Sequence, residues 1–232
     1  MISARSKFRI VKRGFEKTIV LVPGWATDYK IFDTLDLKYN YILPIDINFI
    51  DFKYSLLKFL EASSVERVSL FGWSQGGFLA SDFASHNTEK IDELILAGIR
   101  KRYDQNTLEE IRCKLKQNKR AFLYKFYLNC FSQYDNKACG WFKRSLLKKY
   151  LDQMNVEYLL CGLDYLSCAR IKAEFLSGVK MIRIFHGAQD KIASLDEALE
   201  IKSCLSHAQF IVLDRLGHLL FLNPDFRKKF NG

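Results

Sequence analysis

Residues 68–77 constrain the fold of this chain more than any other stretch, because an apolar run leads directly into a serine flanked by glycines. The run 67–71 lacks helical spacing, which is typical of a short buried strand. Ser74 follows between Gly72 and Gly76, and glycine lacks the Cβ atom that would collide in a strained strand-to-helix turn. Such a turn lifts the hydroxyl out of the sheet, so Ser74 is predicted to be a nucleophile. A plain turn with a helix-capping serine is the alternative.

Short apolar runs alternate with helical patterns over the first hundred residues and again near the end of the chain. This alternation predicts an α/β fold whose mostly parallel sheet has helices on both faces. The expected strands are 8–11, 18–22, 41–45, 67–71, 91–97, 181–185 and 209–213, and the expected helices are 31–35, 54–62, 75–84, 195–201 and 224–230. Pro44 indicates a bulge or an edge-like pairing in the third strand.

Residues 101–178, here called the helical segment, interrupt this alternation and show only helical patterns. We expect them to form a lid over the carboxyl edge of the sheet, inserted into a core made of residues 1–100 and 179–232. The inner face of a lid commonly forms one wall of a substrate pocket, so an apolar slot is expected above the serine. The residues expected to bind substrate are Trp25, Trp73, Phe126, Phe131 and Trp141.

Positive charge is concentrated in the helical segment. The chain has a net charge of +10, and between Lys101 and Lys149 thirteen Lys or Arg residues face four acids. This excess is either a solvated helical surface or a platform for an acidic partner. No nucleic-acid-binding motif accompanies the charge, so nucleic acid is not the expected partner.

The six cysteines all lie between residues 113 and 204 and form no CxxC pair or zinc-ligand pattern. We therefore expect reduced, mostly buried thiols and no metal. The apolar run 18–22 is too short for a signal peptide, and no span approaches twenty apolar residues. These observations predict a monomeric cytoplasmic protein without stable membrane association.

An acid and a histidine each follow a predicted strand in the second half of the chain. Asp190 lies just beyond the run 181–185, and His218 follows the run 209–213 by a few residues. The order serine, acid, histidine is typical of one class of serine hydrolase. Asp214 is a rival acid, and the histidines at 86, 186 and 207 have no comparable placement.

Backbone N–H groups are predicted beside Ser74 at two turns. The first N–H groups of the helix that starts at Gln75 lack intrahelical acceptors. The run 18–22 ends in the turn 23–26, which places the N–H of Trp25 at the same edge of the sheet. The N–H groups of Trp25 and Gln75 are the expected donors to an oxyanion.

The chain resembles the α/β-hydrolases, and more closely the pimeloyl-[acyl-carrier protein] methyl ester esterases of biotin synthesis. The resemblance rests on four motifs in order, which are Val22-Pro23-Gly24-Trp25, Gly72-Trp73-Ser74-Gln75-Gly76-Gly77, Gly187-Ala188-Gln189-Asp190 and Gly217-His218, and on the lid sequence Leu159-Leu160-Cys161-Gly162-Leu163-Asp164-Tyr165-Leu166. Two features depart from the family, since Pro23 stands where a histidine is common and the loop after Asp46 lacks a Pro-Gly-x-Gly pattern.

The resemblance implies a carboxylesterase that needs no cofactor and uses Ser74, Asp190 and His218 as its triad. It also implies an acidic acyl carrier protein as the partner that presents the ester. The basic residues expected to bind that carrier are Arg112, Lys116, Lys143, Arg144, Lys148 and Lys149.

Three alternatives stay open from the sequence. The same triad suits an acyl thioesterase or a general short-chain carboxylesterase. The fold also suits a non-catalytic ligand-binding protein, and the basic segment suits an anionic membrane surface or nucleic acid.

Overall fold

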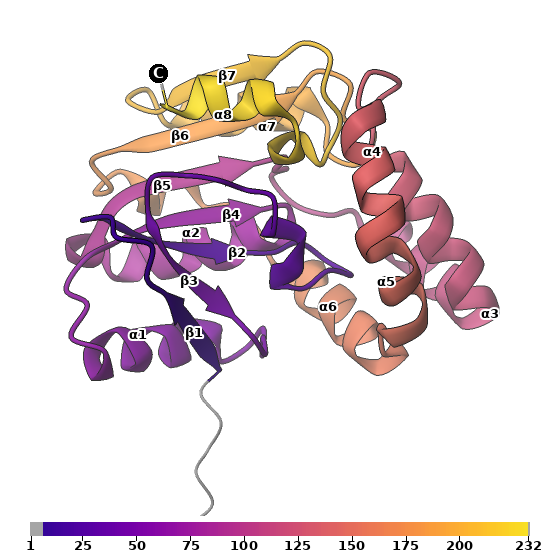
Figure 1. Ribbon diagram of the computed structural model, residues 1–232, viewed down its shortest axis with the longest axis horizontal. Helices are drawn as coiled ribbons and strands as arrows, with labels where there is room; N and C mark the ends of the chain where they lie inside the picture. The colour runs from indigo at the N-terminus through magenta and orange to yellow at the C-terminus, as the bar shows by residue number, and fades with distance from the viewer. Residues whose placement is uncertain (1–6, 232) are drawn as a thin grey trace, which may run out of the picture.

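The computed structural model describes residues 7–231 and contains one seven-stranded sheet. Its strand order is β1-β3-β2-β4-β5-β6-β7, and every neighbouring pair is parallel except β1 with β3. The strands are β1 (Phe8–Val11), β2 (Thr18–Val22), β3 (Asn40–Pro44), β4 (Val68–Trp73), β5 (Ile91–Ala97), β6 (Ile182–Gly187) and β7 (Gln209–Leu213). The predicted α/β architecture is therefore confirmed (Figure 1).

Helices lie on both faces of this sheet. The core helices are α1 (Phe52–Ala62), α2 (Gln75–His86), α7 (Leu195–Cys204) and α8 (Pro224–Asn231). A Cβ atom on Gly72 of β4 would lie 2.8 Å from Ala80 Cβ, so Gly72 faces α2. Adjacent side chains of a strand point to opposite faces, and Phe71 accordingly packs on Phe226 of α8, with ring centroids 5.9 Å apart.

The helical segment lies between β5 and β6 in the chain. Its elements are α3 (Gln105–Asn129), α4 (Asn136–Phe142), the π-helical stretch η3 (Lys143–Leu147), α5 (Lys148–Gln153), α6 (Val156–Cys168) and the short 3-10 helix η4 (Ala173–Leu176). Figure 1 shows α3 to α6 gathered on the side toward which the strand arrows point. Two patterns that are separate in the sequence join in α3 across a kink at Asn118.

β3 lies between β1 and β2, but Pro44 pairs only with Phe8 of β1 and has no partner in β2, so the edge-like pairing expected from Pro44 is confirmed. Pro44 is the last residue of β3, where a missing N–H interrupts no ladder within the strand. The helix expected at 31–35 is the 3-10 helix η1 (Tyr29–Phe32).

The cysteines are free thiols, as expected, but most of them are not buried. Cys113, Cys161, Cys168 and Cys204 are exposed, and Cys130 alone among the six is buried. The four exposed thiols lie on α3, α6 and α7, each of which turns a polar face to solvent. Composition predicts how often a residue type is buried, whereas the face of the helix decides each case.

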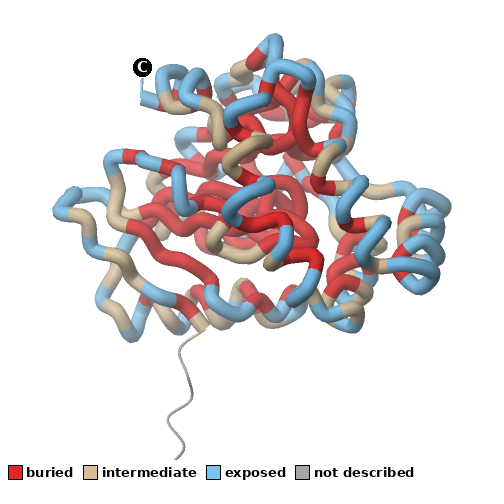
Figure 2. Tube along the Cα trace, turned by 45° about the vertical axis from the view of Figure 1, so that its right-hand side comes forward, coloured by how far each residue is buried: buried red, intermediate tan, exposed pale blue. Residues whose placement is uncertain are grey.

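Buried positions run along the central strands and continue into the inner faces of the surrounding helices (Figure 2). All six residues of β4 are buried, which is expected of a central strand covered on both faces. Within residues 7–231 no helix combines the length and the apolar character needed to span a bilayer.

Candidate active site

Ser74 occupies a strained turn between β4 and α2. Its backbone has φ +54° and ψ −121°, a conformation that costs about 1 to 3 kcal/mol for a residue other than glycine. The flanking glycines are required by close packing. A Cβ atom on Gly72 would lie 2.6 Å from the carbonyl oxygen of Gly76, and one on Gly76 would lie 2.2 Å from that of Val22. The turn therefore fixes Ser74 at the carboxyl end of β4, against the end of β2.

Asp190 and His218 meet on the loops that follow β6 and β7. Asp190 Oδ2 accepts a hydrogen bond from His218 Nδ1 at 2.7 Å, and both side chains are buried. The two loops touch so closely that a Cβ atom on Gly187 would lie 2.3 Å from the carbonyl oxygen of Leu216. Asp214, the rival acid, is exposed.

The Asp190 carboxylate is held by three donors. Its Oδ1 accepts hydrogen bonds from the backbone N–H groups of Ile192 at 2.8 Å and Ala193 at 2.9 Å, while Oδ2 faces His218. Burial alone would raise the pKa of Asp190, but the charge and hydrogen bond of His218 and the N–H of Ala193 outweigh it and lower the pKa. Asp190 is therefore an ionised acceptor that keeps the proton of His218 on Nδ1.

The other ring nitrogen of His218 is available. His218 Nε2 is buried and has no hydrogen-bond partner within residues 7–231. The Tyr103 side chain lies beside Ser74. Burial raises the pKa of Tyr103 to about 12, although the charge of Arg100 and the interaction with Ser74 act in the opposite direction. Tyr103 is thus a neutral neighbour of the serine at physiological pH.

Helix α6 covers the two turns that present backbone N–H groups beside Ser74. Trp25 Nε1 donates to the carbonyl oxygen of Leu159 at 2.9 Å, and Gln75 Nε2 donates to that of Gly162 at 2.8 Å. The backbone N–H of Trp25 has no acceptor in the described part of the chain. Ser74 is consequently only 7% exposed.

The helical segment also supports the turn after β2, where Pro23 replaces the histidine common in the family it resembles. Tyr127 donates its hydroxyl proton to the carbonyl oxygen of Ala26 at 2.5 Å, and Tyr150 donates to Asp28 Oδ1 at 2.8 Å. Ala26 itself has a positive φ of +59°. Side chains from α3 and α5 therefore hold this turn in place.

Comparisons with known proteins agree with this geometry. A family model described as alpha/beta hydrolase fold matches residues 23–225. The chain belongs to the alpha/beta hydrolase fold family. No curated protein sequence matches it. Solved structures similar to this α/β hydrolase include an esterase (EaEST) from Exiguobacterium antarcticum, with 17% identity, a TM-score of 0.78 and coverage of 96% of this chain and 92% of the other. They also include an enol-lactonase from Burkholderia xenovorans LB400, with 16% identity, a TM-score of 0.76 and coverage of 96% of this chain and 92% of the other. A bromoperoxidase from Bacillus anthracis has 17% identity, a TM-score of 0.79 and coverage of 97% of this chain and 91% of the other. At these identities the likeness concerns the fold.

The five aromatic residues expected to bind substrate are spread over the interior of this α/β hydrolase. Trp73 is buried, and its Nε1 donates to the carbonyl oxygen of His218 at 2.9 Å. Phe131 is also buried. Phe126 is half-buried and packs edge-on against Trp25 with centroids 5.1 Å apart, and Trp141 is half-buried.

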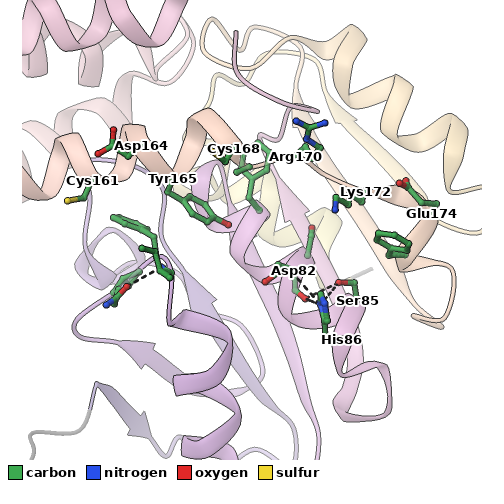
Figure 3. Close-up of a pocket in the computed structure, with 18 of the residues that line it drawn as sticks. Asp82, Ser85, His86, Cys161, Asp164, Tyr165, Cys168, Arg170, Lys172 and Glu174 are labelled. Carbon is green, nitrogen blue, oxygen red and sulfur yellow. Dashed lines mark hydrogen bonds and ion pairs between the residues drawn. The ribbon is translucent and has the colours of Figure 1, made fainter. Parts of the chain in front are cut away.

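A large cavity lies away from these residues. It has a volume of about 1300 Å³ and runs between α2, α6 and the loop 46–50. None of the five aromatic residues expected to bind substrate lines it, and Ser74 does not line it either. Figure 3 shows Tyr165 of α6 pointing into this cavity, with Asp82, Ser85 and His86 of α2 on the opposite side.

The six predicted carrier-binding residues differ in their exposure and in their ion pairs. Arg112 is engaged, because its guanidinium pairs with Glu109 at 3.1 Å and Asp164 at 2.6 Å. Lys149 is half-buried beside Lys30, and this contact lowers its pKa. The four that are exposed are Lys116, Lys143, Arg144 and Lys148.

Sequence reasoning missed two neighbours of the candidate triad. Tyr103 has no motif, and only its place shortly after β5 relates it to the carboxyl edge of the sheet. His186 is buried with Nε2 3.8 Å from Asp190 Oδ2, and burial lowers its pKa. His186 and Asp190 are four positions apart in the sequence. His186 lies within β6, however, and the sequence does not indicate which side of the strand its side chain faces.

Proposed function

We propose that this protein is a serine carboxylesterase that hydrolyses the methyl ester of pimeloyl-[acyl-carrier protein] in biotin synthesis. The observation on which the chemistry rests is the 2.7 Å hydrogen bond between His218 Nδ1 and Asp190, with the second nitrogen of His218 unpartnered near a strained serine. A base oriented by an acid beside a serine is the arrangement that activates a hydroxyl for acyl transfer.

In this mechanism Ser74 Oγ attacks the ester carbonyl carbon while His218 Nε2 takes the hydroxyl proton. For this transfer the Ser74 hydroxyl must point at His218 Nε2. The N–H groups of Trp25 and Gln75 stabilise the resulting oxyanion, each by about 3 to 4 kcal/mol. His218 then gives the proton to the departing methoxide, which leaves as methanol.

The second half of the cycle releases the acid. Water attacks the acyl-serine while His218 again accepts a proton, and the intermediate collapses to the free carboxylate and Ser74. Asp190 stays ionised throughout, and its charge stabilises the imidazolium that forms twice in each turnover.

Substrate entry requires α6 to move, because Leu159 and Gly162 lie over the two N–H turns. The helical segment thereby acts as a lid in this proposal. Phe126 and Trp141, which are half-buried, would become walls of the acyl slot once α6 has moved.

The carrier part of the proposal rests on charge. Lys116, Lys143, Arg144 and Lys148 are exposed on the helical segment, and no ion pair involves any of them within residues 7–231. An acidic carrier protein would be steered to such a surface.

The test compares pimeloyl-carrier methyl ester with a small p-nitrophenyl ester. Wild type is expected to cleave both and Ser74→Ala neither. Reversing the four exposed charges to Glu is expected to raise KM for the carrier ester about tenfold and to leave the small ester unaffected. Lys58→Glu is the control, since Lys58 is exposed on α1, which lies outside the helical segment 101–178. If the charge reversals lower activity equally on both esters, the carrier protein is not the partner of this surface. If an acyl-carrier thioester is cleaved faster than the methyl ester, the protein is a thioesterase rather than an esterase.

A further inference from the structure

Asp135 is a buried acid of the helical segment whose carboxylate reaches the loop that holds His218. We call residues 215–219 the His loop. Asp135 is 2% exposed, and its Oδ2 accepts hydrogen bonds from the backbone N–H of Ser132 at 2.8 Å and of Gly217 at 2.9 Å. Asn223 Nδ2 lies 3.5 Å from Oδ1. Since Gly217 directly precedes His218, Asp135 binds the peptide group that leads into the candidate base.

The surroundings of Asp135 make this contact costly. It stands at the N-cap position of α4, yet its side chain accepts no capping hydrogen bond from that helix. It also forms no ion pair with any residue from 7 to 231. A buried carboxylate without a cation destabilises a fold unless hydrogen bonds compensate, and an acid at this position would ordinarily cap the helix. The carboxylate is instead directed at the His loop.

Neighbouring residues of the same stretch bind the His loop on either side of Gly217. Ser132 Oγ donates to the carbonyl oxygen of Arg215 at 2.6 Å, and the N–H of Leu219 donates to that of Cys130 at 3.1 Å. A Cβ atom on Gly217 would lie 2.7 Å from both Cys130 O and Ser132 N. Residues 130–135 therefore clamp the His loop by hydrogen bonds at its first, third and fifth positions.

We infer that Asp135 is a positioning residue for His218, which aligns the imidazole with Ser74 by fixing the Gly217 peptide. This inference rests on the proposed function, in which His218 is the base. Asp190 fixes the ring through Nδ1, and Trp73 packs against the ring with centroids 5.3 Å apart. The direction of Nε2 depends on the backbone from which the ring projects. A displacement of about 1 Å at such a group lowers a rate by about 100-fold.

The test uses two substitutions of Asp135, one of which removes the acceptor for the Gly217 N–H and one of which keeps it. Asp135→Ala removes the acceptor, and kcat on a small p-nitrophenyl ester is expected to fall 10- to 100-fold with KM within twofold of wild type. Asp135→Asn keeps an oxygen that can accept from Gly217, and it is expected to retain kcat within about threefold. Asp152→Ala is the matched control, because Asp152 is an exposed acid of the same segment paired with Arg120.

A second measurement separates positioning from folding. The proton of the short His218 Nδ1–H···Asp190 bond gives a low-field NMR signal, which is expected in wild type and Asp135→Asn and broadened in Asp135→Ala. If Asp135→Ala does not fold, Asp135→Glu, which moves the carboxylate by one methylene, is expected to show the same fall in kcat and the same broadening.

Two results would overturn the inference. One is an Ala variant whose kcat per folded molecule lies within twofold of wild type, and the other is an unchanged low-field signal. If wild type cleaves no ester, the proposed function fails by itself. The NMR signal still decides whether Asp135 positions the ring.

Discussion

The substitution Asp190→Asn tests the candidate triad most sharply, because the structure dictates how the new amide must lie. Two backbone N–H groups, of Ile192 at 2.8 Å and Ala193 at 2.9 Å, point at Oδ1. The amide oxygen of Asn must stay there to satisfy them. The NH₂ group then takes the place of Oδ2 and donates to His218 Nδ1, which places the imidazole proton on Nε2. That tautomer cannot accept the proton of Ser74.

The size of the effect follows from the alternative orientation of the amide. Restoring an acceptor toward His218 would turn NH₂ toward Ile192 and Ala193 and leave two buried donors unsatisfied. Each costs about 1 to 3 kcal/mol, so the inactive tautomer is favoured by about 2 to 6 kcal/mol. At 1.36 kcal/mol per factor of ten, kcat falls between about 30-fold and about 3 × 10⁴-fold, with about 10³-fold in the middle.

The assay is kcat on a small p-nitrophenyl ester, together with ¹⁵N chemical shifts of the His218 ring. Asp214→Asn is the control, because Asp214 is the exposed acid nearest in sequence to His218, and it is expected to keep kcat within twofold. An Asp190→Asn enzyme that keeps more than a tenth of the wild-type kcat would refute the tautomer reasoning. So would a ring that keeps its proton on Nδ1.

Two further predictions concern stability. Gly162→Ala places a Cβ atom 2.7 Å from Trp25 Cδ1 and is expected to lower the free energy of unfolding by about 1 to 2 kcal/mol, measured with denaturant. The control is Gly140→Ala on α4, whose Cβ atom would meet only an Arg144 nitrogen at 3.3 Å. This variant is expected to be neutral or stabilising. Equal stability of both variants would show that α6 does not press on the turn after β2. Burial lowers the pKa of His186 in the folded protein. When the pH falls through about 6.5, the ordinary pKa of histidine, His186 therefore takes up a proton in the unfolded chain before it does so in the native protein. The free energy of unfolding is expected to fall as the pH drops from 7 to 5. In thermal unfolding, His186→Asn is expected to reduce this dependence of stability on pH. An unchanged dependence in the variant would show that His186 is not its cause.

Much of the fold was predictable because its signals are local. A strand that is buried on both faces contains a run of consecutive apolar residues, and 19–22 of β2, 70–73 of β4 and 94–97 of β5 are such runs. At Gly72 and Gly76 an added Cβ atom would lie within 3 Å of neighbouring backbone atoms, so no larger residue fits there. The loops after β6 and β7 were predictable as positions, since parallel strands deliver their carboxyl ends to one edge.

The features that the sequence did not reveal have a common cause. The exposure of the cysteines and the surroundings of the five aromatic residues depend on the direction of each side chain, which residue type alone does not give. Whether Trp73 lines a slot or packs under His218 depends on the direction of its side chain relative to a loop 145 positions later in the chain. Residue type carries no information about such a distant partner.

The sequence by itself determined the sheet, the strained serine and the edge at which an acid and a histidine would gather, because periodicity, glycine and chain order act within a few residues. Only the tertiary structure decided that Tyr103 contacts Ser74, that α6 covers the N–H turns, and that Asp135 binds the His loop. These contacts join residues 29 to 134 positions apart. They arise when packed layers bring separate helices and loops together, and no local pattern encodes them.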